Sequence, residues 1–170
     1  MLNKCVFLDR DGVLNKDYVD YVFSAEKLEI LPGVTESMRK LKEAGYLLIV
    51  ITNQSGIGKG IYRREQMHET HRLIQEASGN LISHFYYAPG HPSISETLSR
   101  KPGTLMFEKA IARFDINPAS SWMIGDKDRD LVPAKKLGIK TIQVDYNDSP
   151  TADFKVTDLT AAVPVILGSP

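Results

Sequence analysis

The chain has 170 residues, of which 42% are hydrophobic and 25% charged, with 21 basic and 21 acidic residues. This length suits one well-buried domain and is too short for two, so we expect residues 1–170 to form a single domain. The near-zero net charge argues against nucleic-acid or acidic membrane partners, and the single cysteine, Cys5, excludes an internal disulfide. No apolar stretch near the N-terminus is long enough for a signal peptide or a membrane span. We therefore expect a cytoplasmic monomer.

Apolar runs alternate with helical patterns along the chain. The predicted strands are Val6–Leu8, Tyr46–Thr52, Phe85–Tyr87, Ser121–Ile124, Thr141–Val144 and an edge strand over Phe154–Val156. The predicted helices run from Pro32-Gly33 to Gly45, over Arg64–Ala77, Gly103–Phe114 and Asp130–Leu137, and after Asp158. This alternation predicts an α/β fold with a Rossmann-like, doubly wound parallel sheet.

Two carboxylates follow the first predicted strand. Val6–Leu8 are core residues, yet Asp9 and Asp11 come directly after them, where open α/β sheets bind ligands. Side chains two residues apart in an extended chain point to the same side, so the two charges would repel each other and favour a cation. Gly12 then allows a sharp turn. We interpret the pair as a ligand site.

A polar loop, Thr52-Asn53-Gln54-Ser55-Gly56-Ile57-Gly58-Lys59-Gly60, follows the second predicted strand. Its threonine hydroxyl and free backbone N–H groups suit phosphate oxygens, although a flexible solvated loop has the same composition. The loop is not a P-loop, because Lys59 lacks the Gly-Lys-Ser/Thr arrangement.

Charged side chains also follow the later strands. Arg100-Lys101-Pro102 precedes a predicted helix, and Pro102 could hold Lys101 at the sheet edge, although a solvated loop is an equal alternative. Asp126 directly follows the fourth predicted strand and would complete an oxygen site of the kind that Mg²⁺ prefers. Asp130 could cap the next helix.

These segments resemble the four motifs of the haloacid dehalogenase (HAD) superfamily, in order. The matching residues are Phe7-Leu8-Asp9-Arg10-Asp11-Gly12-Val13, Thr52, Lys101 and Gly125-Asp126-Lys127-Asp128-Arg129-Asp130. Within the superfamily, the sequence is similar to the branch of heptose 1,7-bisphosphate 7-phosphatases and histidinol-phosphate phosphatases. This closer resemblance includes Tyr86-Tyr87-Ala88-Pro89-Gly90-His91-Pro92 and Ser99-Arg100-Lys101-Pro102. The resemblance implies the HAD fold without a large cap domain.

The resemblance also implies a mechanism, phosphoryl transfer through an aspartyl-phosphate. It makes Asp9 the nucleophile and Asp11 the acid and base, and it places Mg²⁺ on Asp9, the backbone carbonyl of Asp11, and Asp126. The remaining implied roles are phosphate binding by Thr52, Asn53 and Lys101, substrate binding by Arg100, Gln54 and Lys127, and orientation of Lys101 or metal-bound water by Asp130.

One departure from the branch concerns zinc. Many members carry a loop reading Cys-Pro-His-His-Pro followed by Cys-Asp-Cys-Arg-Lys-Pro. Alignment on Pro92 and Arg100-Lys101-Pro102 puts Ala88, Gly90, Thr97 and Ser99 at the four ligand positions. None of these can replace a thiolate or imidazole, so we expect Mg²⁺ and no zinc.

The leading hypothesis is a Mg²⁺-dependent phosphatase for a small phosphorylated sugar, heptose 1,7-bisphosphate, in surface-glycan precursor synthesis. The alternatives are histidinol phosphate or another small phospho-sugar as substrate, and a non-catalytic phospho-ligand binding protein. Lys59, Arg63 and Arg64 could attract a second phosphate or form a solvated surface. The aromatic residues of Tyr18–Phe23 could close over substrate or simply pack.

Overall fold

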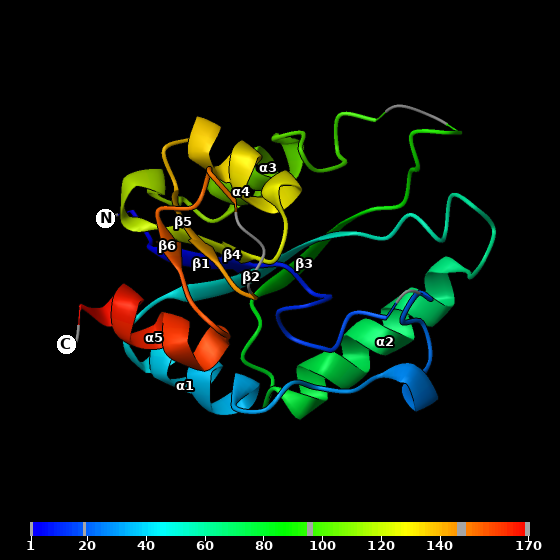
Figure 1. The fold of residues 1–170 in the computed structure, drawn as a ribbon, viewed down its shortest axis with the longest axis horizontal. Helices are drawn as coiled ribbons and strands as arrows, with labels where there is room; N and C mark the ends of the chain where they lie inside the picture. Colours follow the sequence, from blue (N-terminus) through cyan, green and yellow to red (C-terminus); the bar gives the residue numbers. More distant parts are fainter. Residues whose placement is uncertain (1, 19, 95–96, 146–148, 169–170) are drawn as a thin grey trace.

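Six parallel strands form a single sheet in the order β3-β2-β1-β4-β5-β6 (Figure 1). The structure, a computed structural model, describes residues 2–18, 20–94, 97–145 and 149–168. The strands are β1 (Cys5–Leu8), β2 (Leu47–Asn53), β3 (His84–Ala88), β4 (Trp122–Gly125), β5 (Lys140–Gln143) and β6 (Phe154–Lys155). The helices are α1 (Val34–Glu43), α2 (Arg64–Ala77), α3 (Leu105–Arg113), α4 (Asp128–Lys136) and α5 (Leu159–Leu167), with short 3-10 helices η1 (Ala25–Lys27) and η2 (Pro118–Ser120).

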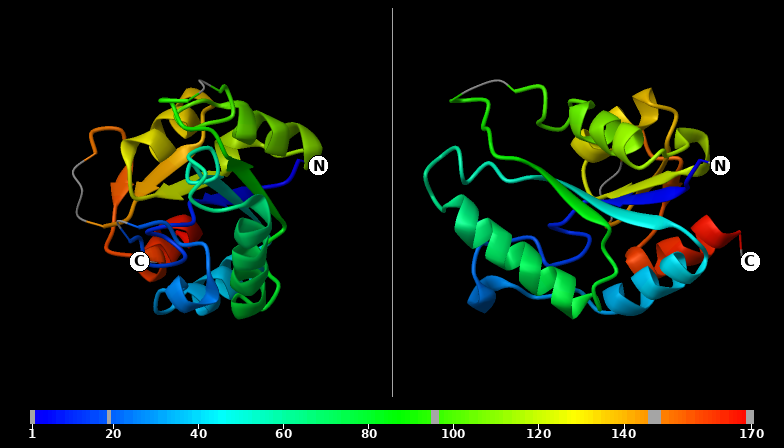
Figure 2. Two further views of the ribbon diagram at one scale, coloured as in Figure 1. Left: turned by 90° about the vertical axis from the view of Figure 1, so that its right-hand side faces the viewer. Right: turned by 180° about the vertical axis from the view of Figure 1, so that it is seen from behind.

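Helices cover both faces of this sheet. α1, α2 and α5 lie on one face, and α3 and α4 lie on the other (Figures 1 and 2). Successive strand residues point to opposite faces, so Leu8 packs in the cluster under α1 and α5 while Phe7 packs in the cluster under α3 and α4. The predicted doubly wound parallel sheet is therefore confirmed.

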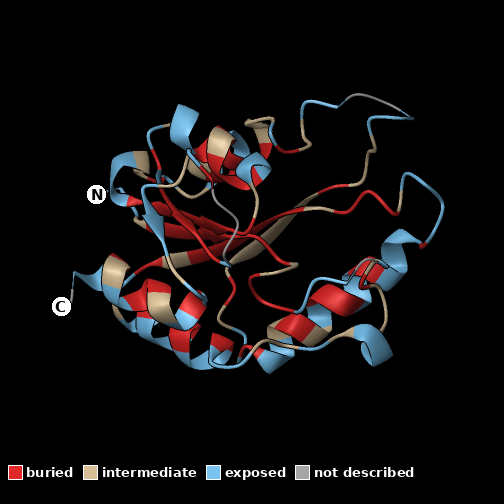
Figure 3. Ribbon diagram, viewed as in Figure 1, coloured by how far each residue is buried: buried red, intermediate tan, exposed pale blue. Residues whose placement is uncertain are grey.

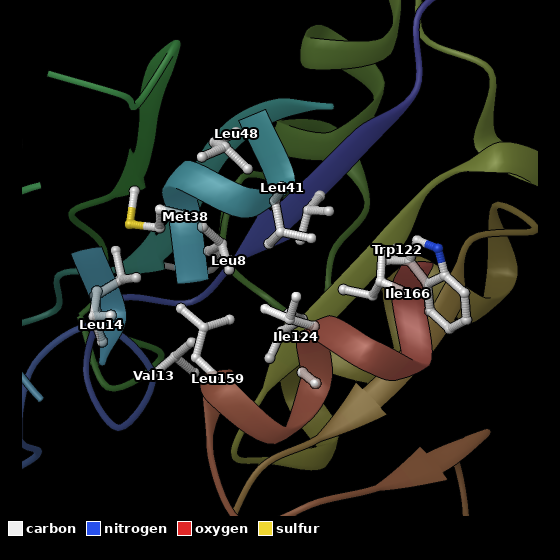
Figure 4. Close-up of a cluster of buried hydrophobic side chains, with 14 of the residues drawn as sticks. Leu8, Val13, Leu14, Met38, Leu41, Leu48, Trp122, Ile124, Leu159 and Ile166 are labelled. Carbon is white, nitrogen blue, oxygen red and sulfur yellow. The ribbon is translucent and has the colours of Figure 1, made fainter. Parts of the chain in front are cut away.

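Apolar burial on both faces holds the central strands in place (Figure 3). In the larger cluster, Leu8 and Ile124 of the sheet pack with Leu41 of α1 and Leu159 of α5 (Figure 4). Each fully buried side chain of this kind contributes about 1.5–3 kcal/mol. The strand ends that carry the polar residues are thus anchored in a rigid core.

The carboxyl ends of three strands meet at one edge of the sheet. Leu8 of β1 is paired with Val50 of β2 and with Ile124 of β4. Residues that follow these pairs leave the sheet together, and the loops after β2 and β3 extend beyond the same edge (Figure 1). The parallel register therefore gathers residues that lie far apart in sequence.

The expected elements are all present, with small shifts at their ends. Arg64–Ala77 is α2 as predicted, whereas α4 begins at Asp128 and not at the expected Asp130. The reason is local: an Asp130 carboxylate oxygen accepts a hydrogen bond of 3.1 Å from the Lys127 N–H, which places Asp130 in the first turn and not at the cap. The described helices and strands include no large cap domain. None of the described helices has the length and hydropathy needed to span a membrane.

Candidate active site

Asp9 is a buried carboxylate that immediately follows β1. The residue is 4% exposed, and its Oδ1 accepts a hydrogen bond from the Arg10 N–H at 2.8 Å and forms an ion pair with Lys101 Nζ at 2.9 Å. Burial, followed by the nearby Asp130 carboxylate, raises the pKa of Asp9 to about 6. The Asp9 carboxylate is therefore held in a nearly dry environment.

Lys101 is the cation that faces Asp9. Its side chain is buried, and Nζ lies 2.9 Å from Asp9 Oδ1, 2.7 Å from Asp130 Oδ1 and 2.6 Å from the Ile51 carbonyl oxygen. Burial lowers the pKa of Lys101, but the two carboxylates outweigh it and the net pKa is raised. The ammonium thus stays charged.

The backbone of Lys101 is held by Asn53 at the end of β2. The Asn53 side chain donates to the Lys101 carbonyl at 3.0 Å and accepts from the Lys101 N–H at 3.0 Å. Because both ends of the amide are engaged, Asn53 fixes the loop that carries Lys101. Its expected contact with phosphate stays a prediction.

Three buried carboxylates form a candidate metal centre. Oxygens of Asp9, Asp126 and Asp130 all lie within 4.8 Å of one another. Asp126 Oδ1 is buried without a hydrogen-bond partner among the described residues, and burial, followed by the Asp9 carboxylate, raises the pKa of Asp126. A Cβ on Gly12 would lie 2.8 Å from Asp126 Oδ2, so only glycine fits beside this carboxylate. The hard oxygen donors and their excess negative charge fit Mg²⁺.

The Asp11 carboxylate does not join this cluster. Its Oδ1 accepts from Arg10 Nη2 at 2.8 Å and from Asn15 Nδ2 at 2.9 Å, and its Oδ2 accepts from Gln54 Nε2 at 3.2 Å. β1 ends at Leu8, so Asp9 and Asp11 both lie in the loop that follows it, and the expectation that they point the same way stays a prediction. Burial would raise the pKa of Asp11, but the Arg10 guanidinium and these hydrogen bonds lower it below its ordinary value.

Thr52 is joined to Asp11 through Gln54. Gln54 Nε2 donates to Thr52 Oγ1 at 2.9 Å as well as to Asp11, and Gln54 Oε1 accepts from the Tyr62 hydroxyl at 2.6 Å. Thr52 is buried at the end of β2, and its hydroxyl hydrogen is free to turn toward an anion. Gln54 therefore orients the two candidate groups.

A pocket of about 350 Å³ opens in front of Asp11, which is 22% exposed. Its lining residues are Asp11, Asp17, Tyr18, Tyr21, Val22, Asn53, Gln54, Ser55, His91, Arg100 and Arg129. Burial and the neighbouring Arg129 both lower the pKa of Arg100, so the two guanidinium groups repel each other across the pocket. An anion between them would remove that repulsion.

Lys127 lies on the other side of the carboxylates. It lines a second pocket with Gly12, Asp17 and Asp126, and its Nζ is 2.7 Å from Asp17 Oδ2 and 3.1 Å from Asp126 Oδ2. Of the three expected substrate-binding residues, the first pocket brings together Arg100 and Gln54 only. Lys59, Arg63 and Arg64 are exposed and do not line it.

Several residues of the site escaped the sequence-based prediction. Arg10 is buried, Tyr62 supports Gln54, and Arg129 faces the pocket from the first turn of α4. Arg10 carried a signal, since an arginine flanked by two aspartates is placed to pair with one of them. Arg129 had no such signal, because its direction depends on where α4 begins.

Comparison with known proteins agrees with this geometry. A family model described as HAD-hydrolase-like matches residues 98–164. D-glycero-beta-D-manno-heptose-1,7-bisphosphate 7-phosphatase of Haemophilus ducreyi is 37% identical over 150 residues, which cover 83% of this chain and 82% of that protein. The corresponding alpha-named enzyme of Burkholderia mallei is 36% identical, with coverage of 83% and 79%.

A solved structure shares the whole fold. The D,D-heptose 1.7-bisphosphate phosphatase of B. bronchiseptica, crystallised with magnesium and phosphate, superposes with a TM-score of 0.90 at 26% identity and covers 98% of this chain and 99% of that one. The curated relatives exceed 30% identity over most of both chains. This chain therefore belongs to the heptose-1,7-bisphosphate 7-phosphatase family of the HAD-like hydrolases.

Proposed function

We propose that this protein is a Mg²⁺-dependent phosphomonoester hydrolase that removes the 7-phosphate of heptose 1,7-bisphosphate. The observation that carries the proposal is the placement of Asp9, a buried carboxylate that contacts Lys101 on one side and shares a carboxylate cluster with Asp126 and Asp130 on the other. Such a group would be a nucleophile between the Lys101 ammonium and the cation that the carboxylates would hold, and family membership supplies the substrate class.

Asp9 and Asp11 divide the reaction between them. An Asp9 oxygen forms a bond to phosphorus while the ester P–O bond breaks and Asp11 gives a proton to the leaving oxygen. Water then attacks phosphorus, the bond between phosphorus and Asp9 breaks, and Asp11 takes the proton back. The products are an alcohol and inorganic phosphate. A phosphate dianion beside Asp11 raises the proton affinity that Arg10 lowers, so substrate binding favours the acid form.

Other residues hold the transferring group. Lys101 Nζ and the Thr52 hydroxyl stabilise charge on the phosphoryl oxygens, where such donors matter most in the transition state. Asp130 orients Lys101 through their 2.7 Å ion pair. Asp9, Asp126 and the Asp11 carbonyl would hold Mg²⁺, which when bound screens the negative charges that otherwise repel the substrate.

The first pocket supports a bisphosphate as substrate. Arg100 and Arg129 line it beyond Asp11, where they would receive a second phosphate while the first reaches Asp9. Histidinol phosphate, the alternative substrate, carries a cationic end that these guanidinium groups would repel. A role as a phospho-ligand binding protein is less favoured, since it would not require Asp9 and Asp11 in addition to Lys101.

We infer a single domain that works as a cytoplasmic monomer without zinc. The loop after β3 has protein contacts in place of metal ligands: Arg100 Nη1 donates to the Gly90 carbonyl at 3.1 Å, and Thr97 Oγ1 lies 3.2 Å from Ser99 Oγ. Metal analysis of the purified protein and its mass in solution test these points.

The experiment is a substrate screen with Mg²⁺ that compares kcat/KM for heptose 1,7-bisphosphate in both anomeric forms, histidinol phosphate and simple sugar monophosphates. The proposal predicts the highest kcat/KM for heptose bisphosphate and no activity in Asp9→Asn. Preference for histidinol phosphate, or full activity in Asp9→Asn, would overturn it. Lys135→Met, on the distant face of α4, is the control.

A further inference from the structure

Arg10 is a buried arginine whose guanidinium binds the carboxylate of Asp11, the residue proposed to act as both acid and base. Its side chain is 1% exposed, although it lies between two aspartates at the sheet edge. Nε lies 3.1 Å from each oxygen of Asp11, and Nη2 donates to Asp11 Oδ1 at 2.8 Å. A planar guanidinium that reaches both oxygens sets the orientation of the carboxylate as well as its charge.

The same guanidinium also holds the segment of residues 21–23. Nη2 donates to the Val22 carbonyl at 2.9 Å, and the next residue, Phe23, stacks on Tyr62 with ring centroids 5.1 Å apart. Tyr62 in turn donates to Gln54, which donates to Asp11. The contacts therefore form a closed ring that joins Asp11 to segment 21–23 by two routes.

Stability alone does not explain this arginine. Arg10 Nη1 is buried without a hydrogen-bond partner among the described residues. A desolvated guanidinium with an unpaired N–H group contributes less to folding than an apolar side chain of the same volume would. The Arg10 guanidinium, whose burial costs folding free energy, therefore lies where it orients the Asp11 carboxylate.

We propose that Arg10 is a positioning residue that holds the Asp11 carboxylate at the mouth of the pocket and couples its placement to segment 21–23. The inference rests on the proposed function, in which Asp11 transfers the proton. Proton transfer needs the carboxylate within hydrogen-bond reach of the leaving oxygen, and a displacement of about 1 Å can cost about 100-fold in rate. A lysine at this position would keep the positive charge but could not contact both Asp11 oxygens with a planar pair of N–H donors.

The test is a double-mutant cycle on hydrolysis of heptose 1,7-bisphosphate with Mg²⁺. We expect Arg10→Met to lower kcat by about 10- to 100-fold while KM changes by less than about threefold. In the Asp11→Asn background the same substitution should lower kcat by no more than about twofold, because Arg10 acts through Asp11. Arg10→Lys should recover part of the loss, and Arg39→Met on the exposed face of α1 should have no effect.

Each kcat is calculated per mole of folded protein, with the folded fraction of each variant measured by urea unfolding. If Arg10→Met does not fold, Arg10→Lys takes its place in the cycle. An equal loss in the wild-type and Asp11→Asn backgrounds would show a general structural role and overturn the inference, as would a kcat within threefold of wild type. If Asp11→Asn itself keeps the wild-type kcat, Asp11 does not transfer the proton. That result would overturn the proposed role of Asp11 and, with it, the role of Arg10 that depends on it.

Discussion

Replacement of Lys101 by methionine is a direct probe of the buried charge network. The ammonium makes three contacts at 2.6–2.9 Å, and its removal leaves Asp9 and Asp130 buried beside each other. Loss of one partner from a buried ion pair costs about 3–5 kcal/mol, because the remaining charge is uncompensated. We expect Lys101→Met to lower the free energy of unfolding by that amount near pH 7.5 in EDTA.

The decrease in the free energy of unfolding caused by Lys101→Met should be smaller at acidic pH. The pKa of Asp9 is about 6 in the folded protein and 3.8 in the reference state, and Lys101 is one of the groups that lower it. Without Lys101 the folded pKa rises further, so between these values the native state binds more protons than the unfolded state. The free energy of unfolding of the variant therefore increases as pH falls toward about 5.

Urea unfolding of wild type and variant near pH 7.5 and pH 5 measures both effects. The matched control is Lys135→Met, which removes an exposed ion pair with Asp153 and should cost no more than about 1 kcal/mol at either pH. A loss of less than about 1 kcal/mol for Lys101→Met, or the same loss at both pH values, would contradict the role of Lys101 as the counter-ion of the two buried carboxylates.

Other changes separate the parts of the site. Thr52→Val should lower kcat about 10- to 100-fold with little change in thermal stability, and an unchanged kcat would remove Thr52 from phosphate binding. Arg129→Met should raise KM for heptose bisphosphate about tenfold and leave KM for a monophosphate unaltered, since in the proposed complex Arg129 would contact only the second phosphate; equal effects on both would count against the pocket assignment. Added Mg²⁺ should raise the melting temperature more near pH 7.5 than near pH 5, because protons compete for Asp9 and Asp126, and the shift should vanish in Asp126→Asn.

Much of the fold could be predicted because its signals are local. The strand around Leu48–Ile51 is a continuous apolar run, and α2 shows regular helical spacing, so each is visible within its own segment. The convergence of Asp9, Thr52 and Asp126 also follows from the sequence, because parallel strands end at one edge. Lys101 reaches this edge as expected, though nothing in its own segment shows that it is buried.

The direction of Asp11 and the burial of Arg10 depend on distant partners. Arg10 is held by Val22, 12 residues away, and Asp11 by Gln54, 43 residues away. Composition alone favours an exposed arginine. Arg129 lines the pocket from the first turn of α4, which starts two residues before its expected first residue. Such features arise from tertiary contacts and cannot be read from one segment.

Phosphorus NMR of the reaction products tests whether the protein removes the 7-phosphate through Asp9. Heptose 1,7-bisphosphate is incubated with Mg²⁺ and either wild-type protein or Asp9→Asn. We predict that the wild type converts the bisphosphate into one equivalent of inorganic phosphate and heptose 1-phosphate, and that Asp9→Asn leaves both phosphate resonances intact. Release of the 1-phosphate, or turnover by Asp9→Asn at the wild-type rate, would contradict the assignment.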